Sequence, residues 1–272
     1  MALDRDSLFQ ILDDIAPPYL AESWDHVGPQ IIPTADAEVR AVIVCLDCTR
    51  SVIEEASACG ADLIIAHHPL IFTPMDKLIH GRYPCNLIFD IIRIGIGLFV
   101  MHTNLDKAAG GINDRLAHLV GLKDVSPLVP HPGHEQESGL GRIGMLARPT
   151  KLSLMCEDLR KQLAPSSLRM VGSADALVQR IAVCSGSGAS LIHEAIDCGA
   201  DALLTGDVKY HQAMEAQGLG MALIDAGHFA TERIVVPLLK ERLEKIMSER
   251  EQGKDVVIHT SRSQQDPLRE AP

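Results

Sequence analysis

Two stretches of the sequence, AVIVCLDCTRSVIEEASACGAD (residues 41–62) and RIAVCSGSGASLIHEAIDCGAD (residues 180–201), decide the fold because they repeat one pattern. At an offset of 139 residues, ten of their 22 positions are identical, where average composition would give about one or two. In each copy a β-branched run is followed by a helical pattern, a Cys-Gly helix stop and a second apolar run. This order predicts a strand, a helix and a parallel strand in each half of the chain.

A further strand and a second motif follow each copy. The first half reads LFVMHTNLD and the second ALIDAGHFATE, and an offset of 126 aligns His102 with His228 and Asp106 with Glu232. Both halves therefore carry a histidine and an acidic residue four positions apart, just past a strand. Duplication of one unit is the simplest explanation for two motifs repeated in the same order.

The repeat predicts two similar α/β domains with parallel-rich sheets flanked by helices. A stretch rich in proline, glycine and polar residues places the boundary between them near residues 124–132. We therefore expect the first domain over residues 1–126 and the second over 127–272, with a C-terminal helix able to pack back on the first. A short strand is expected at 256–258.

Composition restricts the class of protein. The 272 residues include 25 Lys and Arg against 36 Asp and Glu, a net charge of −11 without a basic cluster, which argues against nucleic-acid binding. The longest apolar run, residues 87–101, contains charges and falls short of the roughly 20 residues of a membrane span. The N-terminal residues lack the pattern of a secretory signal, so we expect a cytoplasmic protein. Seven scattered cysteines suit reduced, buried thiols.

Polar side chains gather where the predicted strands end. In parallel sheets, ligand sites lie at the carboxyl ends of the strands. Five residues at these ends have side chains that bind metals: His67, His68, Asp106, His228 and Glu232. The last two lie four positions apart at the start of a helix that we expect to continue to about residue 247, so they share one face of it.

This set of three imidazoles and two carboxylates predicts a metal site in a cleft between the domains. Imidazole with carboxylate suits zinc, iron, manganese or nickel, whereas all-oxygen sites suit magnesium and calcium. Five ligands exceed the needs of one tetrahedral ion, so we expect two divalent ions bridged by a carboxylate. A structural role is the alternative for each histidine taken alone, and the joint placement of three motifs after three strands favours the metal.

Other residues have two interpretations each. His102 can be a ligand, a hydrogen-bonding support for a ligand or a substrate contact, and we leave it out of the metal set. Cys45 and Cys48 are expected in the core rather than on zinc. The stretch Ser185-Gly-Ser-Gly-Ala is either a tight turn or a phosphate-binding loop. Three residues are candidates for substrate binding, with capping or loop packing as the alternative: Thr205, Asp207 and His211.

With these residues in view, the sequence resembles the NIF-three-like family, also called the GTP cyclohydrolase I type 2 family. The matching motifs span nearly the whole chain: Trp24-Asp25-His26-Val27-Gly28, Gly60 to Pro69, His102 to Asp106, Gly110 to Asp114, Gly141 to Gly144, Thr205 to Asp207 and Gly227 to Glu232. The departures are His26, where relatives carry asparagine, and Pro29. The resemblance implies a dinuclear centre on the same five ligands, two similar α/β domains and a ring-shaped homohexamer.

Two functions follow as hypotheses. The first is a metal-dependent hydrolase or cyclohydrolase acting on a small phosphorylated molecule, with GTP ring opening as the activity that the resemblance implies. A bound ion would lower the pKa of water to about 7, and His102 is the candidate general acid or base. The second is a non-catalytic metal-binding scaffold, metallochaperone or regulator.

Overall fold

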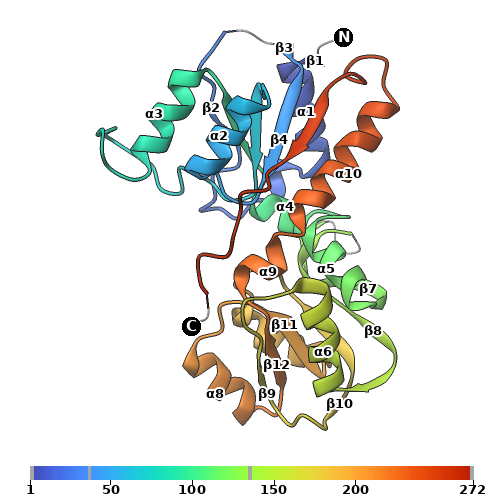
Figure 1. The fold of residues 1–272 in the computed structure, drawn as a ribbon. Coiled ribbons are helices and arrows are strands. Elements are labelled where there is room, and N and C mark those ends of the chain that lie inside the picture. Colours follow the sequence, from blue (N-terminus) through green and yellow to red (C-terminus); the bar gives the residue numbers. More distant parts are fainter. Residues whose placement is uncertain (1–2, 36–37, 134–136, 270–272) are drawn as a thin grey trace. The chain divides into compact units, whose positions relative to one another are not determined.

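The computed structural model describes residues 3–35, 38–133 and 137–269, which fold into two compact units. The first unit contains the residues up to Leu105 and Val235–Gln264, and the second contains Asp106–Ile234 and the residues from Gln265 onward (Figure 1). Both are mixed α/β structures in which helices flank a sheet, as the sequence predicts.

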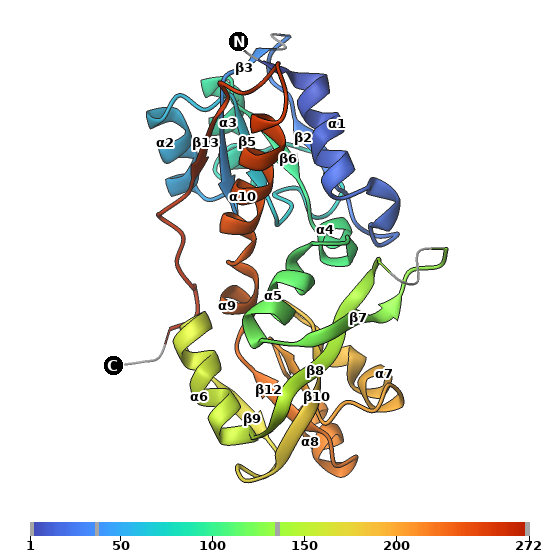
Figure 2. The same cartoon turned by 90° about the vertical axis from the view of Figure 1, so that its right-hand side faces the viewer.

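Within the described residues, the main sheet of the first unit has the strand order β13-β4-β5-β6-β2, with β2 antiparallel to β6 and all other pairs parallel. Its strands are β2 (Gly28–Ile31), β4 (Ala41–Cys45), β5 (Leu63–Ala66), β6 (Gly97–Val100) and β13 (Val257–Thr260). Four helices cover the sheet: α1 (Arg5–Ile15), α2 (Arg50–Ala58), α3 (Cys85–Ile94) and α10 (Val235–Ser248), the last beside β4 and β13 (Figure 2). Short elements complete the unit: β1 (Leu3–Asp4), β3 (Glu38–Val39) and the 3-10 helix η1 (Pro18–Leu20).

The central strands of this sheet are apolar throughout because both faces are covered. Every residue of β4 and β5 is buried. Ile43 and Cys45 pack in one core cluster with α2 and α3, whereas Phe99 on β6 meets the ring of Phe9 on α1 at 4.9 Å. All seven cysteines lie in the described residues and are free thiols, and Cys48 belongs to the same core cluster, as expected.

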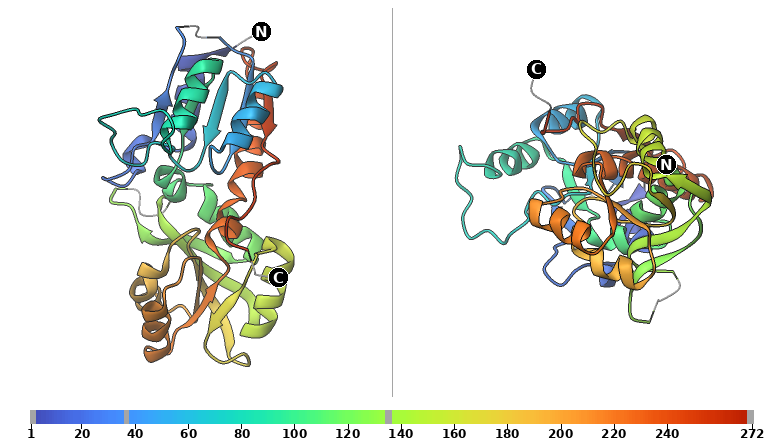
Figure 3. Two further views of the ribbon diagram at one scale, coloured as in Figure 1. Left: turned by 60° about the vertical axis from the view of Figure 1, so that its left-hand side comes forward. Right: turned by 90° about the horizontal axis from the view of Figure 1, so that it is seen from below.

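Within the described residues, the sheet of the second unit has the order β7-β8-β10-β11-β12-β9. Its central strands β10, β11 and β12 are parallel, and the outer strands pair antiparallel. The strands are β7 (Lys123–Pro130), β8 (Gly139–Lys151), β9 (Arg169–Val171), β10 (Leu177–Val183), β11 (Ala202–Thr205) and β12 (Ala222–Asp225). The helices are α5 (Ile112–Val120), α6 (Leu152–Leu163), η2 (Ala189–Leu191), α7 (Ile192–Asp197), α8 (Tyr210–Gly218) and α9 (His228–Glu232). Helix α6 lies on the opposite side of the sheet from α7 and α8 (Figures 2 and 3). The short helix α4 (Thr103–Lys107) follows β6.

The two units repeat the same hydrogen bonds at the offset of the sequence repeat. Val44 is opposite Ile65 in the first sheet, and Val183 is opposite Leu204 in the second. In each unit an aspartate accepts two consecutive backbone N–H groups of the neighbouring segment, at the start of β4 in the first unit and within β10 in the second. Asp62 accepts those of residues 40 and 41, and Asp201 those of residues 179 and 180.

One region differs from the sequence expectations. The single helix expected to continue to about residue 247 is two helices, α9 and α10. Pro237 explains the break, because it has no N–H to donate to the carbonyl of Arg233 and is tolerated only in the first turn of a helix. Most of the stretch 124–132, near which we place the boundary between domains, belongs to strand β7. The short strand expected at 256–258 is present as β13.

Within the described residues, no helix is long and apolar enough to cross a membrane.

Candidate metal centre

Three histidines of the first unit form one cluster. His67 and His68 directly follow β5, and His102 follows β6, the neighbouring strand of the sheet. The ring centroids lie 5.1, 5.4 and 5.7 Å apart, and one nitrogen of each ring lies within 4.8 Å of the others. The sequence predicted the meeting of His67 and His68, and the structure adds His102 to it.

An oxygen lies behind each ring of this cluster. The Nδ1 atom of His67, which is fully buried, is 2.7 Å from the carbonyl oxygen of Met101. That of His68 is 2.8 Å from Oδ1 of Asp47, and that of His102 is 3.0 Å from Oδ2 of Asp25.

The hydrogen bonds of His67 and His68 fix the tautomers of these two rings, and the Asp25 carboxylate 3.0 Å from Nδ1 of His102 favours the same tautomer there. When Nδ1–H donates to an oxygen, the lone pair of a neutral imidazole is on Nε2. Metal-binding histidines almost always have such an oxygen partner. The cluster therefore offers three oriented nitrogen donors.

Asp25 is held as a carboxylate. Its Oδ2 accepts the Thr103 hydroxyl at 2.5 Å and the Thr103 N–H at 3.1 Å. Burial raises the pKa of Asp25, but the hydrogen bonds from His102 and Thr103 outweigh it and hold the pKa well below its usual range. The His102 ring therefore faces a fixed negative charge.

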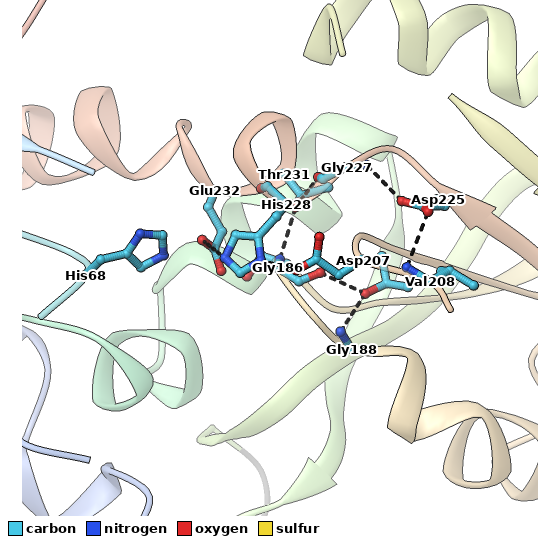
Figure 4. A network of polar contacts seen from close by, with 12 residues as sticks. His68, Gly186, Gly188, Asp207, Val208, Asp225, Gly227, His228, Thr231 and Glu232 are labelled. Atoms are coloured by element: carbon cyan, nitrogen blue, oxygen red, sulfur yellow. Dashed lines mark hydrogen bonds and ion pairs between the residues drawn. The ribbon is translucent and has the colours of Figure 1, made fainter. Parts of the chain in front are cut away.

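His228, in the second unit, lies between two carboxylates (Figure 4). Its Nδ1 is 2.7 Å from Oδ2 of Asp207, and its Nε2 is 2.8 Å from Oε2 of Glu232, the residue one helical turn later in α9. Burial lowers the pKa of His228, but the two carboxylates outweigh it and raise the pKa to about 9. In the metal-free protein His228 is therefore an imidazolium at pH 7.

Asp106 joins the same end of the second sheet. Its carboxylate and that of Glu232 lie within 4.8 Å of one another. The Asn113 side chain connects this region to the loop after β10, because Nδ2 donates to the Asp106 carbonyl at 3.0 Å and Oδ1 accepts the Ser185 N–H at 2.8 Å. The second unit thus brings together one imidazole and two carboxylates from the predicted ligand set, with Asp207 beside them.

Glycine is required in the loop after β10 because the ligand side chains come close. Gly186 has φ +61°, and a Cβ there would lie 2.1 Å from Oε1 of Glu232 and 3.3 Å from Cε1 of His228. The backbone N–H groups of this loop donate to side chains of the unit: Ser185 to Asn113, Gly186 to Thr231 at 3.0 Å, and Gly188 to Thr205 at 2.8 Å. Three amides of this tight turn are therefore already engaged with side chains of the unit.

The three predicted substrate residues lie in different surroundings. Thr205 is fully buried, and its hydroxyl also donates to the Gly186 carbonyl at 3.2 Å, so it supports the glycine loop. Asp207 has φ +55° and a half-exposed side chain directed at His228. His211 is an exposed residue of α8 that contacts the Tyr210 ring.

Sequence reasoning gave no role to the carboxylates behind the histidines. Asp47 lies just past β4 and Asp25 lies in the loop before β2. Asp25 belongs to the Trp-Asp motif of the resemblance, which is a signal, whereas Asp47 has only its place at a strand end. Asp225, at the end of β12, contacts no histidine in the described residues but holds the segments on both sides of the site: it accepts the N–H groups of Val208 at 3.3 Å and Gly227 at 3.0 Å, and pairs with Arg169.

The donor chemistry fits divalent ions of the zinc, iron, manganese and nickel type. Oriented imidazole nitrogens and carboxylate oxygens are the ligands that these ions take in proteins, and the Nδ1 atoms of His67, His68 and His228 each have an oxygen partner. The described residues therefore contain histidine and carboxylate groups able to hold a metal ion.

Comparison with known proteins supports the mixed α/β fold described above. The model of the family described as Duf34/NIF3 (NGG1p interacting factor 3) matches residues 3–267. A protein of Nostoc named GTP cyclohydrolase 1 type 2 homolog is 42% identical over 233 residues, covering 85% of this chain and 88% of its own. One of the same name from Clostridium acetobutylicum is 33% identical over 269 residues, 99% of both chains. The solved structure of a Bacillus cereus protein related to NIF3 superposes with a TM-score of 0.91 at 25% identity, covering 99% of both chains.

Proposed function

Because this chain belongs to the Duf34/NIF3 family, we propose that it is a dinuclear metal-dependent hydrolase or cyclohydrolase acting on a small phosphorylated molecule such as GTP. The observation that carries the proposal is the cluster of His67, His68 and His102, in which each ring has an oxygen behind its Nδ1. The names of the relatives supply the choice of GTP as a substrate to test.

In this proposal each unit contributes part of the ligand set. The ligands of two divalent ions are His67 and His68 from the first unit, and Asp106, His228 and Glu232 from the second. The equal hydrogen bonds around Asp62 and Asp201 support an origin of the units by duplication.

The bound ions would supply an activated water and polarise the substrate. His102 is the proton carrier in this scheme, because Asp25 holds Nδ1 and leaves Nε2 to accept or release the proton. Asp47 positions His68 and Asp207 positions His228. Asp207 and His211 are also the proposed contacts to the substrate. Thr205 acts as a support of the glycine loop rather than as a direct contact.

A second candidate is a non-catalytic metal-binding scaffold, metallochaperone or regulator. One observation favours it: the loop N–H groups of Ser185, Gly186 and Gly188 donate to side chains, so this turn does not offer them to a phosphate. For the enzyme, a substrate phosphate would have to be bound elsewhere or by the ions.

The family resemblance and the composition support two further parts of the proposal. We place the protein in the cytoplasm as a homohexamer whose partner is a small molecule, not a membrane or a nucleic acid.

The test combines metal content with turnover. Purified protein is loaded with Zn²⁺, Fe²⁺, Mn²⁺ or Ni²⁺, its metal content is measured by mass spectrometry, and it is incubated with GTP and a panel of nucleotides and phosphoesters. We expect two ions per chain and turnover that the Asp106→Ala/His228→Ala variant loses. The matched control is His118→Ala/Asp158→Ala, which removes the same residue types at exposed positions. Two ions without turnover of any substrate would favour the scaffold, and absence of stoichiometric metal would contradict both.

A further inference from the structure

Two exposed aromatic rings lie beside the histidine cluster of the first unit. Trp24, the one tryptophan of the chain, is 51% exposed, and Phe72 is 55% exposed. Their ring centroids are 5.8 Å apart, and the Trp24 ring meets the edge of His102 at 6.0 Å. Only 3% of the residues are aromatic, so an exposed pair at this place is not a consequence of abundance.

Exposure of such rings needs an explanation, since a tryptophan is on average a highly buried residue. Exposed apolar patches of this kind mark sites of binding. Aromatic side chains that leave a face open are the usual platforms on which planar heterocycles stack, because every such ring has a π-face.

The two segments that carry the rings are fixed by one side chain. The amide of Gln30 on β2 accepts the Ile71 N–H at 3.0 Å, donates to the Ile71 carbonyl at 3.0 Å and lies 3.2 Å from the His26 carbonyl. The segment before β2 and the loop after β5 are thus tied to the same strand, next to Trp24 and Phe72. A platform held in this way binds without first ordering its loops, which lowers the entropic cost of binding.

The geometry decides how a ring can be bound. The planes of Trp24 and Phe72 are inclined by 47°, and a ring between them would need two stacking distances of at least about 3.5 Å each. The observed 5.8 Å between the centroids is too short for that. The ligand must therefore lie on the open face of the indole, with Phe72 supporting the indole from its side.

We infer that Trp24 and Phe72 form a stacking subsite for a planar nitrogen heterocycle whose reacting part extends toward His102. This inference deepens the proposed function by assigning the substrate class, since it requires a heteroaromatic compound rather than a simple phosphoester. It rests on the proposed function for the direction in which the ligand extends, whereas the stacking itself needs only the rings.

The single tryptophan makes the test direct. Guanosine 5′-monophosphate is titrated into the metal-loaded protein while Trp24 fluorescence is excited at a wavelength where the ligand does not absorb, and ribose 5-phosphate serves as the probe that lacks the ring. We expect saturable quenching by the first and none by the second. Absence of quenching, or equal quenching by ribose 5-phosphate, would overturn the subsite.

Variants then separate stacking from folding. Replacement of a stacking aromatic by alanine weakens binding of a base roughly five- to 150-fold, so Trp24→Ala should raise the Kd for guanosine 5′-monophosphate in calorimetry by a factor in this range. Trp24→Phe should restore most of it, which a purely structural role would not predict. Phe72→Ala should weaken the quenching, and Leu78→Ala, an exposed apolar residue of the same loop, is the control. A Kd unchanged within twofold in Trp24→Ala would contradict the inference.

The outcome is separable from that of the proposed function. If guanosine 5′-monophosphate still quenches Trp24 fluorescence in metal-free protein, the stacking subsite stands even where no hydrolase activity is found. Turnover of GTP with the same KM in Trp24→Ala and in the unchanged protein would leave the hydrolase standing and remove the subsite.

Discussion

Three parallel strands stand in the middle of each unit, and at their carboxyl ends the units present different side chains. At the repeat offset of 139, His67 and His68 of the first unit correspond to Gly206 and Asp207 of the second. Asp47, which holds His68, corresponds to Gly186. One unit thus ends its strands with imidazoles that have oxygens behind them, whereas the other ends them with glycines and carboxylates around one imidazole.

An extra residue explains part of this difference. Val100 in the first sheet and Asp225 in the second occupy equivalent ladder positions, opposite Ala66 and Thr205. His102 follows two residues after the first, but His228 follows three after the second. The additional residue brings the backbone over Gly206, where a Cβ would lie 2.6 Å from the nitrogen of His228.

The comparison indicates how one arrangement of strands can carry two different sets of metal-binding side chains. We call the strand register, together with the contacts of Asp62 and Asp201, the frame. Strand register and the aspartate contacts before the second strand are kept, because a register shift would turn buried side chains outward. The strand ends carry no such constraint and differ between the units. Substitutions at the strand ends should therefore change metal affinity. Equivalent substitutions in the shared frame should lower the free energy of unfolding by similar amounts in the two units.

The largest effect is expected for Gly186→Ala. Its Cβ would be 2.1 Å from Oε1 of Glu232, so the carboxylate has to move. Metal affinity should fall at least about 100-fold, and stability should fall by more than the 1–2 kcal/mol that a left-handed alanine costs. Competition with a metal chelator and urea denaturation measure the two.

The matched control for this variant is Gly220→Ala. Gly220 has φ +72° and nothing within 4 Å of the added Cβ, so it imposes the backbone strain without the clash. It should lose about 1–2 kcal/mol and keep its metal. If Gly186→Ala behaves like Gly220→Ala, the glycine does not make room for Glu232.

A smaller effect is expected for the carboxylates behind the histidines. The Asp25 side chain is 1% exposed and accepts hydrogen bonds from the His26 N–H and from the Thr103 N–H and hydroxyl, whereas the Asp207 side chain is 44% exposed. Asp25→Asn should lower the free energy of unfolding by about 2–3 kcal/mol, and Asp207→Asn by less than about 1 kcal/mol. Both should reduce turnover roughly 10- to 100-fold. Equal stability losses in urea denaturation would contradict the difference between the units.

The units should also respond to opposite ends of the pH scale in metal-free protein. The raised pKa of His228, about 9 against 6.5 for an ordinary histidine, contributes stability that is fully present below pH 6.5 and lost as pH rises through 9. The lowered pKa of Asp25 contributes stability that is present above its ordinary 3.8 and lost as pH falls below it.

Urea midpoints measured from pH 3 to 10 test this prediction. His228→Gln should remove the loss between pH 6.5 and 9 and leave the acid loss unchanged, and Asp25→Asn should do the reverse. An alkaline loss that persists unchanged in His228→Gln would show that another group is responsible.

The strands and helices of the repeat could be predicted from the sequence because their patterns are set by burial on both faces. β4, α2 and β5 agree with the pattern around residues 41–66. The place of His67 and His68 at a strand end follows from the same logic, since the carboxyl ends of neighbouring parallel strands lie together. These features depend on local periodicity and on one topological rule.

Other features depend on contacts that the sequence pattern does not encode. The partnership of Asp47 with His68 joins residues 21 positions apart through a side-chain orientation. The extra residue before His228 is hidden when the motifs are aligned on the histidines themselves. Pro237 was a visible signal for the end of a helix, and the apolar periodicity on both sides of it led to the expectation of one helix.

The smallest difference is expected within the frame itself. Asp62 accepts the N–H groups of Arg40 and Ala41 at 2.6 and 3.0 Å, and Asp201 accepts the equivalent N–H groups of Gln179 and Arg180 at 2.8 and 2.8 Å. Asp62→Ala and Asp201→Ala should therefore each cost about 1–3 kcal/mol, with a difference of less than about 0.5 kcal/mol.

Hydrogen exchange distinguishes a local effect from a global one. The amides of Ala41 and Arg180 should exchange faster in the respective variants, because each loses the carboxylate that accepts its N–H. Asp197→Ala, an exposed aspartate at the end of α7, is the control and should change neither. If only one of the two frame variants loses stability, the equal hydrogen bonds do not carry equal energy, and the divergence of the units extends from the strand ends into the frame.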